Sequence, residues 1–207
     1  MSRSARALAL AALGLVAACR RGEQGDALLP GGLHGAILRP ALPKPDFRLV
    51  DESGRPFDFR RETDGYLTFL YFGYTHCADV CPVQMANLAG ALHQLPPASV
   101  QRMKVVFVTT DPARDSAARL RQWLGFFDPG FIGLTGTPAA LRAAQLASGL
   151  PPAEREDIPG GGYGVGHAAQ VLVFTPDDSE RAQYPFGIRQ EDWAHDLPRL
   201  LTLGSGR

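Results

Sequence analysis

The sequence predicts an α/β fold, and two observations carry that prediction. Short apolar runs rich in β-branched and aromatic residues, at residues 66–73 and 104–110, are typical of buried strands. Between such runs, apolar residues recur every three or four positions, which is the period of an amphipathic helix. Strands that alternate with helices form a sheet with helices packed on its faces. With 207 residues and no repeat period, the chain is expected to form one domain behind an N-terminal leader.

Residues 1–18 are predicted to be a bacterial lipoprotein signal. Arg3 and Arg6 precede an apolar stretch of about a dozen residues, too short to span a bilayer comfortably. Small residues then lead to Cys19, which resembles a lipoprotein cleavage site and implies a lipid on the Cys19 sulfur. An ordinary secretory signal is the alternative, and either signal exports the domain. Residues 19–43, rich in Gly, Pro and Leu, are interpreted as a tether, and residues 44–204 as the folded domain.

The first half of the domain is predicted to be a β-hairpin followed by strand, helix and strand. Residues 47–59 hold two alternating runs around a turn with Gly and Pro, which is typical of a hairpin. Residues 66–73 suit a buried central strand, and residues 104–110 suit a second. The helix between them shows an apolar stripe over residues 85–95, and Pro82 falls in its first turn, where a missing N–H costs nothing.

The second half continues the alternation and ends in an antiparallel pair of strands and a helix. Residues 151–166, rich in Gly and Pro, are predicted to be a long polar loop. Pro198 is a candidate break in the last helix, because an internal proline removes a helical hydrogen bond. The predicted elements are a helix over 116–127, a strand over 131–134, a helix capped by Thr137, strands over 170–175 and 181–187, and a helix over 190–201.

Cys77 and Cys81 stand between the first core strand and its helix. The order of elements matches a thioredoxin-like plan with an N-terminal hairpin extension, and active thiols of that plan lie at this position. A disulfide between two cysteines so close in sequence would stabilise the fold only weakly, because the entropic stabilisation by a disulfide grows with the length of the loop that it closes. The helix N-terminus favours an anion, so we expect Cys81 to have a lowered pKa. The spacing permits either a disulfide or a metal chelate.

His167 ends the predicted long loop, just before a strand. In a thioredoxin-like fold this loop faces the active thiols and usually carries a cis-proline; here Ala168, Ala169 and Gln170 follow the histidine. Two thiolates and one imidazole form a soft ligand set that suits copper, and the same set with water suits zinc.

Four stretches resemble the Sco/SenC family, copper proteins of cytochrome c oxidase assembly: "GYTHCADVCP", "TTDPARDS", "FIGLTGTPAAL" and "YGVGH". The resemblance covers residues 45–203. It implies that Cys77, Cys81 and His167 ligate copper, as Cu(I) or Cu(II). It also implies that the protein delivers copper to the dinuclear CuA centre of the oxidase or reduces that centre's cysteines. The chain departs from the family at Ala78, where Pro is usual, and at Gly166, where Asp is frequent.

From these features we expect the protein to be a copper chaperone that is anchored to the outer face of the bacterial cytoplasmic membrane. Its expected partners are the oxidase subunit that carries CuA and periplasmic copper chaperones or thiol reductants. Whether it is also an enzyme stays open, because a thiol–disulfide oxidoreductase or peroxidase that uses Cys77 and Cys81 as a redox pair is the alternative. The formal net charge of zero, without a basic stripe, indicates no nucleic-acid partner.

Three side chains close to the thiols are assigned structural roles. His76 is expected to point away from Cys77, because successive side chains diverge. Met85 belongs to the apolar stripe and is expected in the core, and Asp79 is expected to cap the helix.

More distant polar residues give weaker signals. His34, His93 and His195 are expected to have no companions of ligand type and to be solvated. Asp111 and Asp115 are either parts of a turn with a local ion pair or acidic groups near the metal site.

Overall fold

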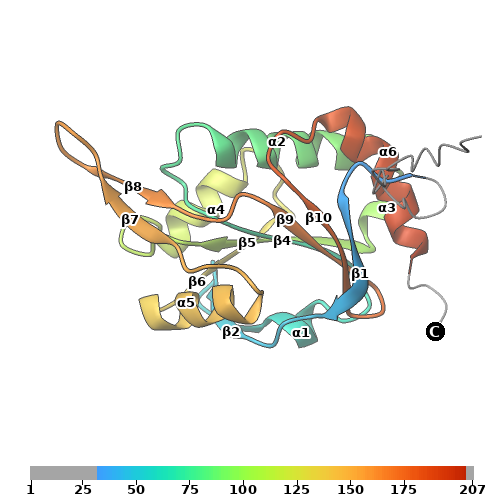
Figure 1. Cartoon of the computed structure of the whole chain (residues 1–207), viewed down its shortest axis with the longest axis horizontal. Helices are drawn as coiled ribbons and strands as arrows, with labels where there is room; N and C mark the ends of the chain where they lie inside the picture. The colour runs from blue at the N-terminus through green and yellow to red at the C-terminus, as the bar shows by residue number, and fades with distance from the viewer. Residues whose placement is uncertain (1–31, 204–207) are drawn as a thin grey trace, which may run out of the picture.

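One mixed sheet of eight strands runs through residues 32–203, the part of the chain that this computed structural model describes (Figure 1). From edge to edge the strands follow the order β1, β10, β9, β4, β5, β6, β2 and β3. Their bounds are β1 Ala36–Pro43, β2 Arg48–Asp51, β3 Pro56–Asp58, β4 Leu67–Gly73, β5 Met103–Thr109, β6 Ile132–Thr135, β9 Val171–Thr175 and β10 Ser179–Tyr184.

Helices cover both faces of this sheet and create two separate cores. In Figure 1, α2, α4 and α6 lie above the sheet, and α1 and α5 lie below it. Along β4, Phe69 and Tyr71 point into the first core, whereas Leu70 and Phe72 point into the second. All seven residues of β4 are buried, which explains its continuous apolar sequence. The helices are α1 Phe59–Glu62, α2 Val80–Leu92, α3 Pro97–Val100, α4 Ala117–Leu124, α5 Pro138–Ala147 and α6 Gln190–Thr202.

The predicted α/β, thioredoxin-like fold is confirmed. Strand β4 pairs with β5 in parallel and with β9 antiparallel, so the two neighbours of the central strand come from distant parts of the chain. The predicted N-terminal hairpin is β2–β3, which pairs antiparallel and extends the far edge of the sheet next to β6. Thr137 caps α5 as predicted, because its side chain accepts a hydrogen bond from the Ala140 N–H at 3.2 Å.

The predicted tether, residues 19–43, is wrong from residue 32 onward. Strand β1 forms the outer edge of the sheet, where it pairs antiparallel with β10, and Leu33 is buried in the first core. The prolines at 40 and 43 hid this strand in the sequence. Proline cannot donate to a ladder, but an edge strand with a register shift, as between Ile37 and Leu42, tolerates it.

The predicted loop 151–166 contains a second, two-stranded sheet instead. Strands β7 (Glu154–Asp157) and β8 (Tyr163–Gly166) pair antiparallel and project from one end of the molecule (Figure 1). The three glycines over 160–162 form the turn and all have positive φ. Every residue of β7 is exposed and those of β8 are only partly buried, so β7 has no apolar alternation that would reveal the ribbon in the sequence.

Pro198 does not break the last helix. Helix α6 continues through it to Thr202, with Trp193, Leu197 and Leu200 buried in the first core on either side of the proline. Burial of this apolar face offsets the hydrogen bond that Pro198 cannot make.

The predicted signal over 1–18, the lipidation site Cys19 and the tether as far as residue 31 lie outside the described residues. Within residues 32–203, no helix is long and apolar enough to cross a membrane.

The role of the segment before β1 can be tested with two leucines. Leu33→Ala should lower the free energy of unfolding by about 2–5 kcal/mol, because it leaves a cavity in the first core. Leu42→Ala, on β1 with its side chain 46% exposed, should change it by at most about 0.5 kcal/mol. Urea unfolding of both variants measures the difference. Equal, small effects would mean that the segment is a tether after all.

Candidate metal centre

Cys77 and Cys81 lie where the central strand passes into α2. Strand β4 ends at Gly73, a short loop carries Cys77, and Cys81 follows in the first turn of α2. Cys81 is fully buried, whereas Cys77 is half-buried. Gly73 is required here, because a Cβ at that position would lie 2.9 Å from the Cys81 Sγ and 2.8 Å from the Tyr71 ring. The glycine therefore lets the strand pass close to the buried sulfur.

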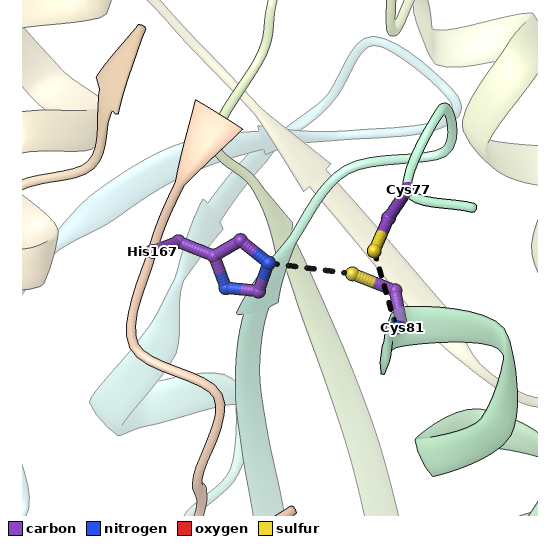
Figure 2. Close-up of side chains that lie close together, drawn as sticks. All are labelled: Cys77, Cys81 and His167. Atoms are coloured by element: carbon purple, nitrogen blue, oxygen red, sulfur yellow. Dashed lines mark hydrogen bonds between the residues drawn. The ribbon is translucent and has the colours of Figure 1, made fainter. Parts of the chain in front are cut away.

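His167 reaches the two sulfurs from the opposite side, as the sequence predicts. It follows β8 and precedes β9, and its Nε2 lies 3.5 Å from the Cys81 Sγ (Figure 2). One potential ligand atom from each of Cys77, Cys81 and His167 lies within 4.8 Å of the others. The Nδ1 lies 2.9 Å from the Ala168 carbonyl oxygen, which can only accept. Nδ1 therefore carries the proton, and the Nε2 lone pair faces the sulfurs.

Two tyrosines enclose the imidazole. The rings of Tyr71 and Tyr74 stand edge-on to His167, with centroids 6.0 Å and 5.7 Å away. The Tyr71 hydroxyl also lies 3.6 Å from the Cys81 Sγ. Burial raises the pKa of Tyr71, so its hydroxyl keeps the proton and donates to the sulfur. Neither tyrosine was recognised from the sequence, because Tyr71 is a β-forming residue within an apolar strand and Tyr74 follows that strand in the loop without a pattern of its own. A hydroxyl within an otherwise apolar buried run is the signal that marks Tyr71.

The two thiols have opposite protonation tendencies. A hydrogen bond from the Cys81 thiol, helped by the Cys81 backbone N–H at 3.4 Å, lowers the pKa of Cys77 to about 4. The same pairing, together with burial, raises the pKa of Cys81. The expectation of a lowered pKa at Cys81 is therefore wrong. Cys81 lies inside the first turn, so the helix N-terminus presents its N–H to the Cys77 sulfur instead.

Asp79 does not cap α2 as predicted. It occupies the N-cap position, but its side chain is exposed and makes no capping hydrogen bond there. Its backbone angles, φ −138° and ψ −71°, lie outside the extended region from which a side chain reaches back to the helix. The Cys77 sulfur accepts the Cys81 N–H in its place.

Asp115 ties the loop that carries Cys77 to the neighbouring strand. Its fully buried carboxylate accepts hydrogen bonds from the Thr75 N–H at 2.9 Å, the Thr75 hydroxyl at 2.7 Å and the Thr109 hydroxyl at 2.7 Å. Thr109 ends β5, and Thr75 belongs to the loop that follows β4. The structure thus assigns Asp115 to positioning the loop that carries Cys77 and not merely to a turn with a local ion pair.

Asp111 positions the other half of the site. It accepts a hydrogen bond from the Tyr163 hydroxyl at 3.0 Å and forms an ion pair with Arg114. The Arg114 guanidinium stacks on the Tyr163 ring at 3.7 Å and donates to the Tyr163 carbonyl at 3.1 Å. Because Tyr163 begins β8, these contacts hold the ribbon that leads into His167.

Gly166, one departure from the resemblance noted above, lies beside an exposed carboxylate. A Cβ at this position would lie 2.5 Å from the Glu156 Oε1 on the neighbouring strand β7. The space beside the backbone before His167 is therefore taken by a carboxylate from another residue.

Two side chains that were predicted to lie outside the metal-ligand group do so. His76 contacts Thr75 and Asp115 and lies outside the Cys77, Cys81 and His167 group, in agreement with the prediction. Met85 is fully buried in the first core, as predicted.

The three further histidines are partly exposed to solvent, as expected, but the expectation that they have no companions of ligand type is wrong. His93 pairs with Asp128 at 2.8 Å, and His34 and His195 both contact the buried Asp196. Asp196 is 162 residues from His34, so no local pattern in the sequence could indicate that contact.

Comparison with known proteins places the chain among proteins of the SCO1/SenC family. The model of the SCO1/SenC family matches residues 37–202. A Stutzerimonas stutzeri protein named for copper binding is 33% identical over 159 residues, covering 76% of each chain. The mitochondrial SCO2 homologue of Danio rerio is 30% identical over 68% of this chain, which spans only 50% of that relative's length. The copper-bound structure of Bradyrhizobium japonicum ScoI aligns with a TM-score of 0.68 and 28% identity, covering 78% of this chain and 100% of that one.

The anchoring role of Asp115 can be tested by Asp115→Asn. The amide cannot accept all the hydrogen bonds that the carboxylate accepts, so the free energy of unfolding should fall by about 1.5–3 kcal/mol. Asp79→Asn is the matched control: its exposed side chain caps nothing, and we expect a change within about 0.5 kcal/mol. Denaturant unfolding of the metal-free chain gives both values. A stability of Asp115→Asn equal to that of the control would remove Asp115 from this role.

Proposed function

This chain belongs to the SCO1/SenC family, and from that premise we propose that it is an exported copper-binding protein of cytochrome c oxidase assembly. Its copper ligands are Cys77, Cys81 and His167. The observation that carries the proposal is the convergence of two sulfurs and an imidazole Nε2, whose lone pair faces them, within 4.8 Å. Sulfur ligands select Cu(I), and an added imidazole makes the set suitable for Cu(II) as well.

The donor set supports copper over a structural zinc ion. Structural zinc sites usually have four protein ligands, whereas the described residues form a group of three here. Cu(I) is held well by two or three soft ligands. A site with so few ligands also leaves room for a ligand from another protein, which suits a protein that passes its metal on.

We further propose that the acceptor is the oxidase subunit that carries CuA. Copper transfer to that centre, or reduction of its cysteines, fits the thiol chemistry of Cys77 and Cys81. Lipidation of Cys19 would hold the domain at the outer face of the cytoplasmic membrane, close to the oxidase, with periplasmic copper chaperones or thiol reductants as further partners.

A thiol–disulfide oxidoreductase is the second candidate function, and one observation favours it. Cys77 is half-buried with a pKa lowered to about 4 by the Cys81 thiol, so it is an accessible thiolate beside a second thiol. Against it, oxidoreductases of this fold usually carry a cis-proline at the entry to β9, whereas Ala168, Ala169 and Gln170 follow His167 here.

His167 separates the two candidate functions. In His167→Ala, the thiolates should retain most of the Cu(I) affinity, because two sulfurs suffice for that ion. Cu(II) affinity should fall by at least about 100-fold, and the thiolate-to-Cu(II) absorption band should be lost. Removing a residue that only hydrogen-bonds to a metal ligand typically lowers metal affinity about 10–100-fold, and removing the ligand itself should cost more. His76→Ala, a histidine next to Cys77 but outside the group, is the matched control and should bind both ions normally.

The cellular test uses a strain that lacks this protein, grown at limiting copper. The His76→Ala variant should restore oxidase activity, and His167→Ala should not. Full restoration by His167→Ala would rule out copper ligation by this residue as the function and place the oxidoreductase first.

Oxidation of the thiols provides an independent test of the ligand set. A disulfide between Cys77 and Cys81 has no thiolate to donate, so the oxidised chain should bind no stoichiometric Cu(I). Reduction should restore one equivalent, as measured against a competing Cu(I) chelator. Stoichiometric binding by protein shown to contain no free thiol would contradict the proposed site.

A further inference from the structure

A second group of metal-ligand side chains lies away from the site described above. One potential ligand atom from each of His34, His195 and Asp196 lies within 4.8 Å of the others. His34 precedes β1, and the other two lie on α6. In Figure 1, α6 lies at the right of the molecule, and the β7–β8 ribbon that leads into the first site lies at the left. The two groups therefore belong to different ends of the fold.

Both imidazoles of this group face one carboxylate oxygen. The Nδ1 of His34 lies 3.0 Å and the Nδ1 of His195 lies 2.7 Å from the Asp196 Oδ1. The Asp196 Oδ2 accepts hydrogen bonds from the Tyr184 hydroxyl and the His34 backbone N–H, each at 2.7 Å. These two bonds fix the carboxylate plane and leave Oδ1 to the imidazoles.

The surroundings have two further properties of a metal site. Asp192 Oδ1 lies 3.6 Å from the Nε2 of His34, and a ligating histidine typically directs its second nitrogen at a carboxylate. Asp196 is fully buried, whereas the side chains of His34 and His195 are 45% and 38% exposed. An ion can thus reach the group from solvent and keep a water ligand on the open side.

The spacing of the ligand atoms suits a small divalent ion. A tetrahedral ion with bonds of about 2.0 Å holds its ligand atoms about 3.3 Å apart. The present separations of 3.0 Å and 2.7 Å from Oδ1 need widening by about 0.3 Å and about 0.6 Å, which two partly exposed side chains can supply.

We propose that His34, His195 and Asp196 form a second metal site, for a divalent cation of intermediate softness such as Zn²⁺ or Cu²⁺. Two imidazoles and a carboxylate are ligands that these ions accept, whereas Cu(I) prefers the thiolates of the first site. On binding, the cation takes the Nδ1 lone pairs that face Oδ1. Each Nδ1 proton leaves to solvent and each Nε2 carries a proton, so both rings bind as neutral imidazoles and the Nε2–H of His34 faces Asp192.

The test uses the full chain with the first site removed by Cys77→Ser, Cys81→Ser and His167→Ala. After removal of metal with a chelator, Zn²⁺ is titrated by calorimetry, and one equivalent should bind. Adding His34→Ala or His195→Ala should weaken binding by at least about 100-fold, and Asp192→Asn by about 10–100-fold. His93→Ala should leave binding unchanged, because His93 also pairs with a carboxylate but belongs to no group of three in residues 32–203.

Three results would overturn the proposal: no stoichiometric Zn²⁺ binding, binding that survives the double change at His34 and His195, or an equal loss in His93→Ala. If circular dichroism shows that the histidine variants do not fold, the proposal is tested instead by electron paramagnetic resonance of Cu²⁺ bound to the chain that lacks only the first site. Coupling to two imidazole nitrogens is expected, and its absence refutes the site. Because this chain lacks the first site, neither result depends on the proposed copper function.

Discussion

The pairing of β4 with β9 on one side and β5 on the other is the constraint on which the functional site depends. The fully buried strand β4 leads into the two cysteines, β5 ends at the threonine that Asp115 binds, and His167 immediately precedes β9. Each ladder therefore brings one component of the site to the same end of β4. The register leaves little freedom, because a slip by one residue would turn the apolar side chains of β4 to the wrong core. Packing of the two cores thus fixes the geometry of the site.

Around that end, polar contacts hold both sides of the site in place. Asp115 secures the loop that carries Cys77, and Asp111 with Arg114 secures the ribbon that leads into His167. Asp111 and Asp115 come from the same short segment after β5, so one stretch of chain braces ligands from two distant parts of the sequence. Such bracing keeps the ligand atoms close together in the absence of metal, which lowers the entropic cost of binding.

Local patterns predicted most of the fold, and contacts between distant residues account for most of the errors. Cys77, Cys81 and His167 could be identified because a helix start and the order of elements are readable from short windows of sequence. The hydrogen bonds of Asp115 reach back 40 residues to Thr75, and those of Asp196 reach 162 residues to His34, so neither leaves a local pattern. The ribbon β7–β8 was missed because β7 has no apolar alternation, and β1 because prolines interrupt its alternation. The opposite pKa directions of the two thiols depend on the hydrogen bond from the Cys81 thiol to the Cys77 sulfur, helped by the Cys81 backbone N–H, and both are details of the loop conformation.

The two sulfurs of the site differ in how easily solvent and other molecules can reach them. Cys77 is half-buried and Cys81 is wholly enclosed beneath it, so a thiol arriving from solution meets Cys77 first. If the site passes an ion to another thiol, as proposed above, the bond to the outer sulfur would be exchanged before the bond to the inner one, which Tyr71 and Gly73 shelter. Loading would follow the reverse order, from the surface inward. Access from solvent would then contribute to the order of bond exchange.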